Sequence, residues 1–209
     1  MASQFGLPTG CLEKWQDVPA ATVSDCLDRW QVMDAAVQRR CGERMVGTAF
    51  PIRVMPGDNL TVHKALSSVP RGSVLVIDAG GYANRAIWGE LLSARAVVRG
   101  AVGAVVDGAV RDVSAVRELG FGCWSRAVSA AGPHKSGGGV WGEAISCGGV
   151  TVSPGDLVIA DEDGVVVVPA AKADETYRAA VDRMEAEASR KSQILAGETG
   201  ASSYDVSEE

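Results

Sequence analysis

The chain has 209 residues, of which 46% are hydrophobic, and its formal net charge is −6. This length supports one sizeable hydrophobic core, and the acidic balance argues against a nucleic-acid-binding protein. No apolar run reaches the roughly 18–20 residues that a membrane-spanning helix needs, and the first residues lack the basic and apolar regions of a signal peptide. We therefore expect a cytoplasmic protein.

The first half of the chain alternates strand patterns with helix patterns. Apolar runs bounded by turn residues predict strands, and apolar residues at helical spacing predict the helices between them. Thr22–Asp28 predicts the capped start of an N-terminal helix, and Pro51 favours an edge strand or a bulge. This order of elements implies a parallel sheet with right-handed crossovers. The expected strands are 46–55, 74–78 and 104–107, and the expected helices are 60–68, 90–99 and 113–119.

The second half of the chain is rich in glycine and predicts short strands joined by tight turns. A long terminal helix follows at 171–196, and the tail after it is acidic. We expect one domain over residues 1–197 and a flexible acidic tail over 198–209. The expected strands are 140–145, 149–152, 157–160 and 165–168, and one face of the terminal helix carries Tyr177, Ala180, Val181, Met184 and Ala188.

The cysteines and histidines limit the kinds of metal site and disulfide that the chain can form. Five cysteines occur without any Cys-x-x-Cys spacing, which favours reduced thiols over a disulfide framework. With His63 and His134 as its two histidines, the chain has little material for a zinc site. A catalytic metal would therefore be an oxygen-liganded ion, Mg²⁺ or Mn²⁺.

The segment Ala104–Asp112 carries the strongest functional signal. It predicts a buried strand, a glycine turn at Gly108, and then Arg111 and Asp112 side by side at the start of a helix. Arginine binds carboxylates with a planar fork of donors, and aspartate can hold a hard divalent cation. Open α/β sheets bind ligands at the carboxyl ends of their strands. The segment therefore predicts a site for a small oxo-acid held against a metal.

A second turn, at Gly89 and Glu90, lies upstream of Arg111, with twenty residues between Glu90 and Arg111. The N–H groups of Leu91 and Leu92 lie in a first helical turn, where they could hold a substrate carboxylate. The acidic and basic residues of both turns also have purely structural explanations. Asp112 is equally well explained as a helix N-cap, Arg111 as a surface arginine, and Glu90 as an acidic residue favoured by the helix dipole.

Other types of site lack the motifs that they require. The Gly80–Gly81 loop is not a dinucleotide-binding fingerprint, and no Gly-x-Ser-x-Gly elbow occurs. His63 is more simply explained as a packed or interface histidine than as a catalyst. No lysine falls in the predicted site, which argues against a Schiff-base aldolase.

Several motifs occur in an order that resembles the RraA-like family, over the chain from about Thr22 to the terminal helix. The resemblance implies an α/β fold, a three-layer β/β/α arrangement of the swivelling-domain type with a long C-terminal helix. The motifs are Pro56–Asn59, Val62–Ala65, Trp88–Leu92, Val106–Asp112 and Asp163–Pro169.

The family contains protein-binding regulators of ribonuclease activity and metal-dependent pyruvate aldolases. The aldolases are marked by an acidic residue, twenty further residues and then Arg-Asp, and Glu90, Arg111 and Asp112 match this marker. The regulators typically lack the aspartate, so the chain resembles the enzyme branch. The family pattern also has Asp or Glu two residues after Arg-Asp, and this chain has Ala115 at that place. The departure concerns supporting contacts more than the metal site.

The resemblance implies a role for each matched residue. Arg111 would bind the carboxylate and keto oxygens of the substrate, Asp112 would be the direct metal ligand, and Glu90 would act through water. Gly89 and the backbone N–H groups of Leu91 and Leu92 would complete the substrate-binding turn.

The resemblance also implies a reaction and an assembly. The chain would be an Mg²⁺- or Mn²⁺-dependent aldolase that cleaves 4-hydroxy-4-methyl-2-oxoglutarate or 4-carboxy-4-hydroxy-2-oxoadipate and decarboxylates oxaloacetate. Family members are trimers or hexamers with sites between subunits, so a neighbour could contribute residues, Asp25 among them. The alternative is a non-catalytic regulator that binds a ribonuclease or another protein. A third reading, menaquinone methyl transfer, is disfavoured because no glycine-rich methyl-donor loop occurs.

Overall fold

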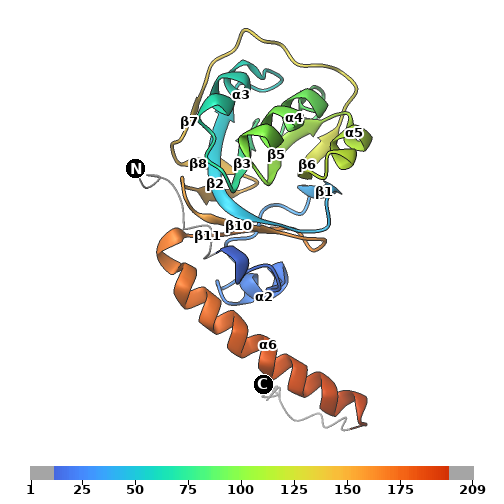
Figure 1. Ribbon diagram of the computed structural model, residues 1–209, viewed down its shortest axis with the longest axis vertical. Helices are drawn as coiled ribbons and strands as arrows, with labels where there is room; N and C mark the ends of the chain where they lie inside the picture. The colour runs from blue at the N-terminus through green and yellow to red at the C-terminus, as the bar shows by residue number, and fades with distance from the viewer. Residues whose placement is uncertain (1–11, 198–209) are drawn as a thin grey trace, which may run out of the picture.

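One long curled sheet organises the chain in this computed structural model, which describes residues 12–197 (Figure 1). Its strands lie in the order β1-β6-β5-β3-β2-β10-β11. The four inner strands β6, β5, β3 and β2 run parallel, which confirms the parallel core predicted for β2, β3 and β5 and adds β6, which was not predicted. These strands are β1 (Gln38–Cys41), β2 (Met45–Val54), β3 (Ser73–Asp78), β5 (Gly103–Val110), β6 (Gly122–Val128), β10 (Leu157–Ala160) and β11 (Val165–Val168).

Shorter strands complete the β-structure. Strand β4 (Ala86–Trp88) pairs with β5, and β7 (Gly139–Trp141) pairs with β2. Strands β8 (Ile145–Cys147) and β9 (Val150–Val152) form a separate two-stranded sheet. The predicted strand 140–145 is therefore wrong, because its two ends belong to different sheets with a turn between them.

The helices lie in two groups. One face of the parallel strands is covered by α3 (Leu60–Ala65), α4 (Glu90–Arg99) and α5 (Val113–Glu118) (Figure 1). At the other end of the molecule, α2 (Ala20–Asp25) packs beside α6 (Ala173–Leu195), next to β10 and β11. Short 3₁₀ turns, Leu66–Ser68 and Ala170–Lys172, adjoin α3 and α6.

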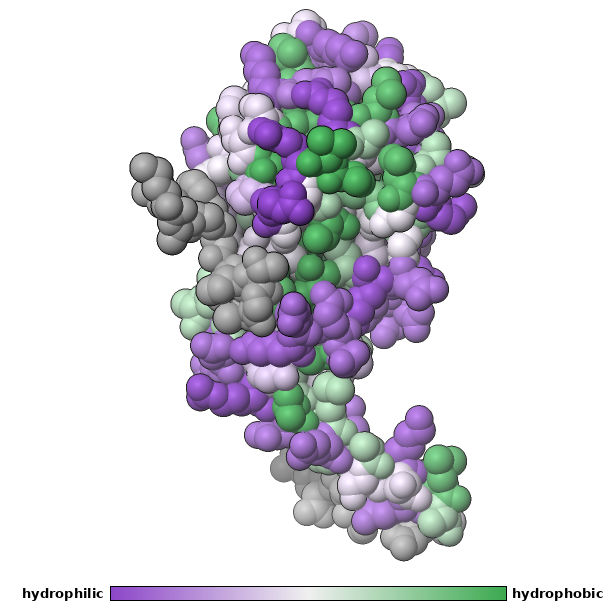
Figure 2. All heavy atoms as spheres, in the orientation of Figure 1, coloured by the Kyte–Doolittle hydropathy of each residue, from purple (hydrophilic) through white to green (hydrophobic). Residues whose placement is uncertain are grey.

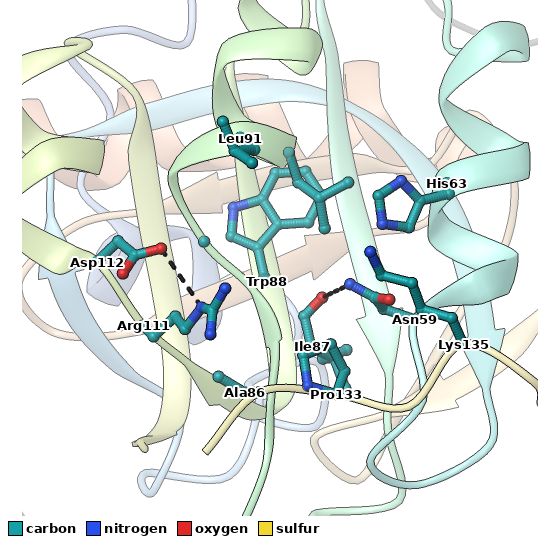
Figure 3. A pocket seen from close by; sticks show the side chains of 13 residues that line it. Asn59, His63, Ala86, Ile87, Trp88, Leu91, Arg111, Asp112, Pro133 and Lys135 are labelled. Atoms are coloured by element: carbon teal, nitrogen blue, oxygen red, sulfur yellow. Dashed lines mark hydrogen bonds and ion pairs between the residues drawn. The ribbon is translucent and has the colours of Figure 1, made fainter. Parts of the chain in front are cut away.

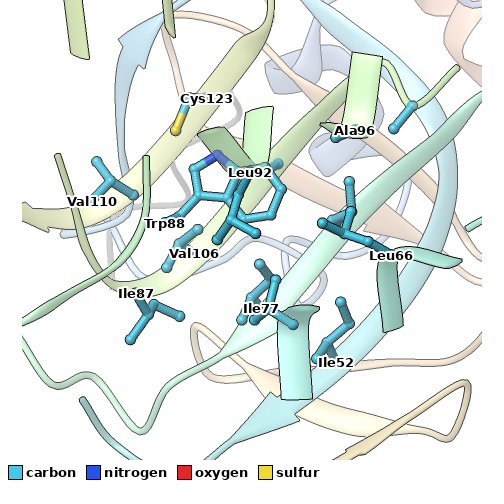
Figure 4. Close-up of a cluster of buried hydrophobic side chains, with 14 of the residues drawn as sticks. Ile52, Leu66, Ile77, Ile87, Trp88, Leu92, Ala96, Val106, Val110 and Cys123 are labelled. Atoms are coloured by element: carbon cyan, nitrogen blue, oxygen red, sulfur yellow. The ribbon is translucent and has the colours of Figure 1, made fainter. Parts of the chain in front are cut away.

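Three groups of buried side chains hold these layers together. The first lies between the parallel strands and the helices α3 to α5, and Ile52, Ile77 and Trp88 are among its members (Figure 4). The second joins the opposite face of the same strands to β8, β9, β10 and β11. The third joins the outer face of β10 and β11 to α2 and α6. The chain is thus a mixed α/β domain with a helix layer, a main sheet and a second β layer.

Strand β2 links all three groups because it curls along its ten residues. Val46, near its start, packs with α2 and α6, whereas Ile52 on the same face packs under α3 and α4. Pro51 lies between the stretch that pairs with β10 and the stretch that pairs with β7. The prediction of an edge strand at Pro51 is therefore wrong, because β2 is internal and its partner changes at the proline.

Two further boundaries differ from prediction. The N-terminal helix begins at Ala20 rather than at Thr22, whose side chain is buried within it. Ala20 N–H donates to Asp161 Oδ2 at 2.8 Å, so a distant carboxylate holds the helix start. Strand β5 continues to Val110, and Gly108 lies inside it rather than in a turn. A Cβ at position 108 would lie 2.8 Å from Ala79 Cβ, so this glycine allows close packing.

The terminal helix is confirmed, although it packs on the body only through its first half. Thr176 and Ala180 are buried, and residues 185–197 are exposed, including Ala188 of the predicted apolar face. Figure 2 shows hydrophilic and hydrophobic side chains side by side on this projecting arm below the body. None of the helices within 12–197 combines the length and apolar character needed to cross a membrane. The predicted acidic tail lies outside the described residues.

Candidate active site

The strand pair β4–β5 brings the two predicted site turns together. Ala86 pairs with Ala109 in parallel register, and Arg111 N–H donates to Trp88 O at 3.0 Å. Each strand ends within a residue or two of this hydrogen bond, and each is followed by a helix. The start of α4 at Glu90 and the Arg111–Asp112 pair therefore lie side by side.

Asp112 occupies the N-cap position of α5 without capping it. Its backbone adopts a left-handed conformation, with φ 55° and ψ 35°, and its side chain makes no cap hydrogen bond. The carboxylate instead turns toward α4, where Oδ2 accepts the Glu90 N–H at 3.4 Å. Arg111 Nε lies 3.5 Å from the same oxygen. The N-cap explanation of Asp112 is therefore wrong, because the left-handed backbone aims its carboxylate at the other helix.

Gly89 is required by the closeness of the two turns. Its backbone is extended, with φ −176° and ψ −164°, so the turn itself does not demand glycine. A Cβ at position 89 would lie 2.7 Å from Asp112 Oδ2 and 3.1 Å from Arg111 Cγ. Any side chain here would displace the Arg111–Asp112 pair.

A cavity of about 290 Å³ opens above these turns (Figure 3). The substrate-binding residues predicted from the sequence meet in it, whereas the exposed Glu90 side chain is not in its wall. The first N–H groups of α4, those of Leu91 and Leu92, have no acceptor within the helical ladder. The cavity is lined by Asn59, His63, Ala86, Ile87, Trp88, Gly89, Leu91, Leu92, Arg111, Asp112, Gly132, Pro133 and Lys135.

The wall opposite Arg111 is formed by residues that the sequence analysis did not place in the site. Asn59, His63 and Lys135 lie together there (Figure 3): Asn59 directly precedes α3, His63 lies on α3, and Lys135 lies on the loop after β6. Because Lys135 lies in the cavity wall, the prediction that the site contains no lysine is wrong. Asn59 and His63 lie in the motifs Pro56–Asn59 and Val62–Ala65, which were the available signals, whereas the glycine-rich loop around Lys135 has no periodicity to place it.

Asn59 has an unused acceptor at this wall. Its side chain is buried, and Nδ2 donates to Ile87 O at 3.1 Å. Its Oδ1 has no hydrogen-bond partner among the described residues. A buried amide oxygen without a donor costs stability unless a ligand or water supplies one.

His63 is held in one orientation by Arg95. Arg95 Nη1 lies 2.9 Å from His63 Nδ1, and a guanidinium can only donate, so Nδ1 is the acceptor. The neutral ring then carries its proton on Nε2. Burial, followed by the charges of Lys135 and Arg95, lowers the pKa of His63 below its usual value. His63 is therefore neutral at pH 7 and offers a donor rather than a base.

Asp58 fixes the loop that carries Lys135. Its Oδ2 accepts the N–H groups of Ser136 and Gly137 at 2.7 and 2.8 Å, and Oδ1 accepts the Leu60 N–H at 2.8 Å. Burial opposes the charged carboxylate, but these three donors together lower the pKa of Asp58. The charge of Asp58 thus ties the start of α3 to the Lys135 loop.

The residues present suit an oxygen-seeking cation with few protein ligands. The Asp112 carboxylate is 41% exposed at the cavity. Residues 12–197 contain no group of three or more acidic, histidine or cysteine side chains placed to hold a metal. Mg²⁺ keeps several waters and often takes only one or two protein carboxylates. Asp112 fits that requirement.

Asp25 is placed elsewhere in the single chain. It pairs with Arg29 Nε at 3.1 Å and with Arg183 at the contact between α2 and α6. Its predicted contribution to a neighbour's site stays a prediction.

Comparison with known proteins assigns the family. A family model described as RraA-like, Aldolase/RraA, matches residues 20–167. The chain belongs to the RraA-like family. Over 127 residues this RraA-like chain is 42% identical to a protein of Halalkalibacterium halodurans named "Putative 4-hydroxy-4-methyl-2-oxoglutarate aldolase". The match covers 61% of this chain and 60% of that relative's length.

Solved structures share the RraA-like fold. An uncharacterized protein from Pseudomonas syringae pv. tomato is similar with a TM-score of 0.82 and 27% identity, over 92% of this chain and 91% of that one. Streptomyces coelicolor RraAS2, described as an unusual member of the RNase ES inhibitor RraA protein family, has a TM-score of 0.80 and 29% identity, over 89% and 98%. The family and the fold expected from the sequence motifs are thus confirmed.

Proposed function

We propose that this chain is a divalent-metal-dependent aldolase that cleaves 4-hydroxy-2-oxo acids of the 4-hydroxy-4-methyl-2-oxoglutarate type and also decarboxylates oxaloacetate. The observation that carries the proposal is the meeting of Arg111, Asp112 and the first turn of α4 in one cavity. The name of the Halalkalibacterium relative supports the same substrate class.

The first end of the cavity suits the pyruvyl half of the substrate. The Arg111 guanidinium, 45% exposed, can bind a carboxylate and the adjacent keto oxygen with its fork of donors. The N–H groups of Leu91 and Leu92 supply further donors at the positive end of α4. Asp112 would hold Mg²⁺ or Mn²⁺ there, and the cation would supply positive charge to the developing enolate oxygen.

The second end of the cavity suits another acid group. Lys135 brings a positive charge, while His63 and Asn59 offer polar groups beside it. A substrate with a carboxylate at each end would span the two cationic walls. This charge pattern supports a substrate that is an oxo-acid with two carboxylates over one with a single carboxylate.

The cleavage step balances without any oxidant. The C4 hydroxyl loses its proton to a water molecule in the cavity, and the C3–C4 bond breaks. The electron pair of that bond remains on the pyruvate enolate, and the C4 oxygen becomes the keto group of the second product. Arg111 neutralises the oxyanion as it forms. Loss of CO₂ from oxaloacetate leaves the same enolate, so one site can perform both reactions.

An oxaloacetate assay tests this proposal simply. The protein is incubated with oxaloacetate and Mn²⁺, with and without a chelator, and pyruvate is followed against a metal-only blank. Pyruvate release above the blank that disappears with the chelator supports the lyase. Release that equals the blank for a folded protein argues against it.

A non-catalytic regulator is the alternative, and the similarity to RraAS2 over 89% of this chain favours it. Such a protein would bind a ribonuclease or another partner and would release no pyruvate in the same assay. In either case we propose a homotrimer or homohexamer in which neighbouring subunits complete the site. The projecting part of α6 offers exposed surface for such contacts.

A further inference from the structure

Two buried thiols face each other on neighbouring strands, away from the proposed active site. Cys41 on β1 pairs in register with Cys123 on β6, and the two strands are antiparallel. Both side chains belong to the buried group beneath the helices, where Cys123 lies near Trp88 (Figure 4). Both cysteines are free in the structure.

The register places the two cysteines within disulfide range. Residues directly opposite on antiparallel strands have Cα atoms about 4.5–5.5 Å apart. Disulfides span Cα separations of about 4.4–6.8 Å. A bulge at Arg40 precedes Cys41, and β1 is the edge strand of the sheet, so its backbone has freedom to adjust. A bond between the two sulfurs therefore needs no rearrangement of the fold.

The two thiols have different surroundings, and the Cys41 thiol donates to Phe121 O at 3.4 Å. The neighbouring Cys123 thiol lowers the pKa of Cys41, with burial opposing and the Arg117 charge assisting. The neighbouring Cys41 thiol and burial raise the pKa of Cys123. Burial raises the pKa of Cys26 and of Cys147. Among the described cysteines, Cys41 is thus the one best suited to attack as a thiolate.

A cationic cavity borders Cys41, whose residue is 4% exposed. The cavity measures about 680 Å³, and Cys41 lies in its wall. Three guanidinium groups, those of Arg39, Arg40 and Arg117, line it against two carboxylates. Arg39 Nη1 lies 3.7 Å from Glu162 Oε2, and the Arg40 guanidinium donates hydrogen bonds to the hydroxyl and the carbonyl oxygen of Ser125. The excess of positive charge favours an anionic reagent.

We propose that Cys41 and Cys123 form a redox-reactive pair that an anionic low-molecular-weight disulfide oxidises to a cross-strand disulfide. The Cys41 thiolate attacks one sulfur of the reagent and displaces the first thiolate, which leaves a mixed disulfide on Cys41. Cys123 then loses its proton, attacks Cys41 Sγ and displaces the second thiolate. Two protein thiols are oxidised, and one reagent disulfide is reduced to two thiols.

Oxidised glutathione is the probe that tests the pair. The reduced full-length protein is incubated with it under native conditions, quenched in acid, alkylated and digested without reductant. We expect one peptide that links Cys41 to Cys123, lighter than the two separate peptides by two hydrogen atoms. Recovery of both cysteines as alkylated thiols overturns the proposal, as does a stable glutathione adduct on Cys41 with Cys123 still free.

Two comparisons make the result specific. In Cys123→Ser the glutathione adduct on Cys41 should persist, whereas the control Cys26→Ser should form the linked peptide like the unmodified chain. Oxidised glutathione should also react about tenfold faster at low salt than cystamine, a cationic disulfide. A faster reaction with cystamine contradicts the role of the arginine-lined cavity. These readouts do not depend on the proposed aldolase activity.

Discussion

The carboxylate of Asp112 accepts a hydrogen bond from the backbone N–H of Glu90 at 3.4 Å, across 22 residues of sequence. This contact joins the start of α5 to the start of α4. It explains why the twenty-residue gap between Glu90 and Arg111 matters. The gap holds one helix and one strand, α4 and β5, so its two ends return to the same edge of the sheet.

Asp112→Asn should abolish most pyruvate release while leaving the fold intact. Asparagine tolerates the left-handed backbone at this position but carries no charge to hold a cation. We expect kcat to fall by about 10²-fold or more, as for removal of one electrostatic stabiliser. Asp163→Asn, in an exposed turn, is the control. Equal rates in both variants contradict a metal-holding role for Asp112.

Arg111→Lys separates charge from geometry. Lysine keeps the positive charge but cannot bind a carboxylate and a keto oxygen with two parallel donors. We expect KM to rise about tenfold, the equivalent of one lost charge-assisted hydrogen bond. Steady-state kinetics with oxaloacetate measure this, with Arg178→Lys on the exposed side of α6 as control. An unchanged KM speaks against substrate binding by Arg111.

Gly89→Ala tests the packing of the two turns. Its Cβ would meet Asp112 Oδ2 at 2.7 Å, so the carboxylate must shift. A displacement of about 1 Å can cost about 10²-fold in rate. The matched control is Gly138→Ala, because a Cβ there meets nothing within 4 Å. Full activity in Gly89→Ala shows that the position of Asp112 is not critical.

Asp58→Asn should make the protein less sensitive to acid. The pKa of Asp58 is lower in the folded chain than in the unfolded chain. Its stabilisation is therefore complete above the unfolded-state value of about 3.9 and is lost as the pH falls through the folded value. The variant should lose about 1–3 kcal/mol of stability near neutral pH. Urea unfolding between acid and neutral pH measures this.

The outcome at low pH distinguishes the charge of Asp58 from its shape. If the variant and the unmodified chain converge in stability as the pH falls, the charge of Asp58 is responsible. If the difference in stability stays constant with pH, the charge of Asp58 is not what holds the loop. The KM of Asp58→Asn for dicarboxylic substrates should also rise, because Lys135 lies on the loop whose N–H groups donate to Asp58.

Elements whose signal is local were predicted well from the sequence. The continuous apolar run 74–78 became β3, since a strand buried on both faces needs little else to specify it. Arg111 and Asp112 were placed at the carboxyl end of a buried strand, where open α/β sheets bind ligands. Strand β4, which brings the start of α4 beside them, was not predicted. Strand β5 extended past the expected end because β4 and β6 pair with its second half.

Features that depend on distant contacts were missed. Lys135 lies in a loop without periodicity, and hydrogen bonds to residues distant in sequence, among them those that the Asp58 carboxylate accepts from Ser136 and Gly137, hold that loop at the cavity. The direction of the Asp112 side chain follows from a left-handed backbone, which the spacing of apolar residues does not reveal. The start of α2 depends on Asp161, 141 residues away in sequence. No pattern among neighbouring residues in the sequence predicts such contacts.

The most direct test of the central claim is the cleavage of 4-hydroxy-4-methyl-2-oxoglutarate by metal-stripped protein to which Mg²⁺ or Mn²⁺ is then added back. The account predicts no pyruvate from the stripped protein and two pyruvates for each substrate once metal is restored. It also predicts that Asp112→Asn stays inactive at metal concentrations that restore the unmodified chain. Cleavage that continues at full rate with chelator present, or no cleavage by the folded, metal-loaded protein, would contradict the proposed aldolase.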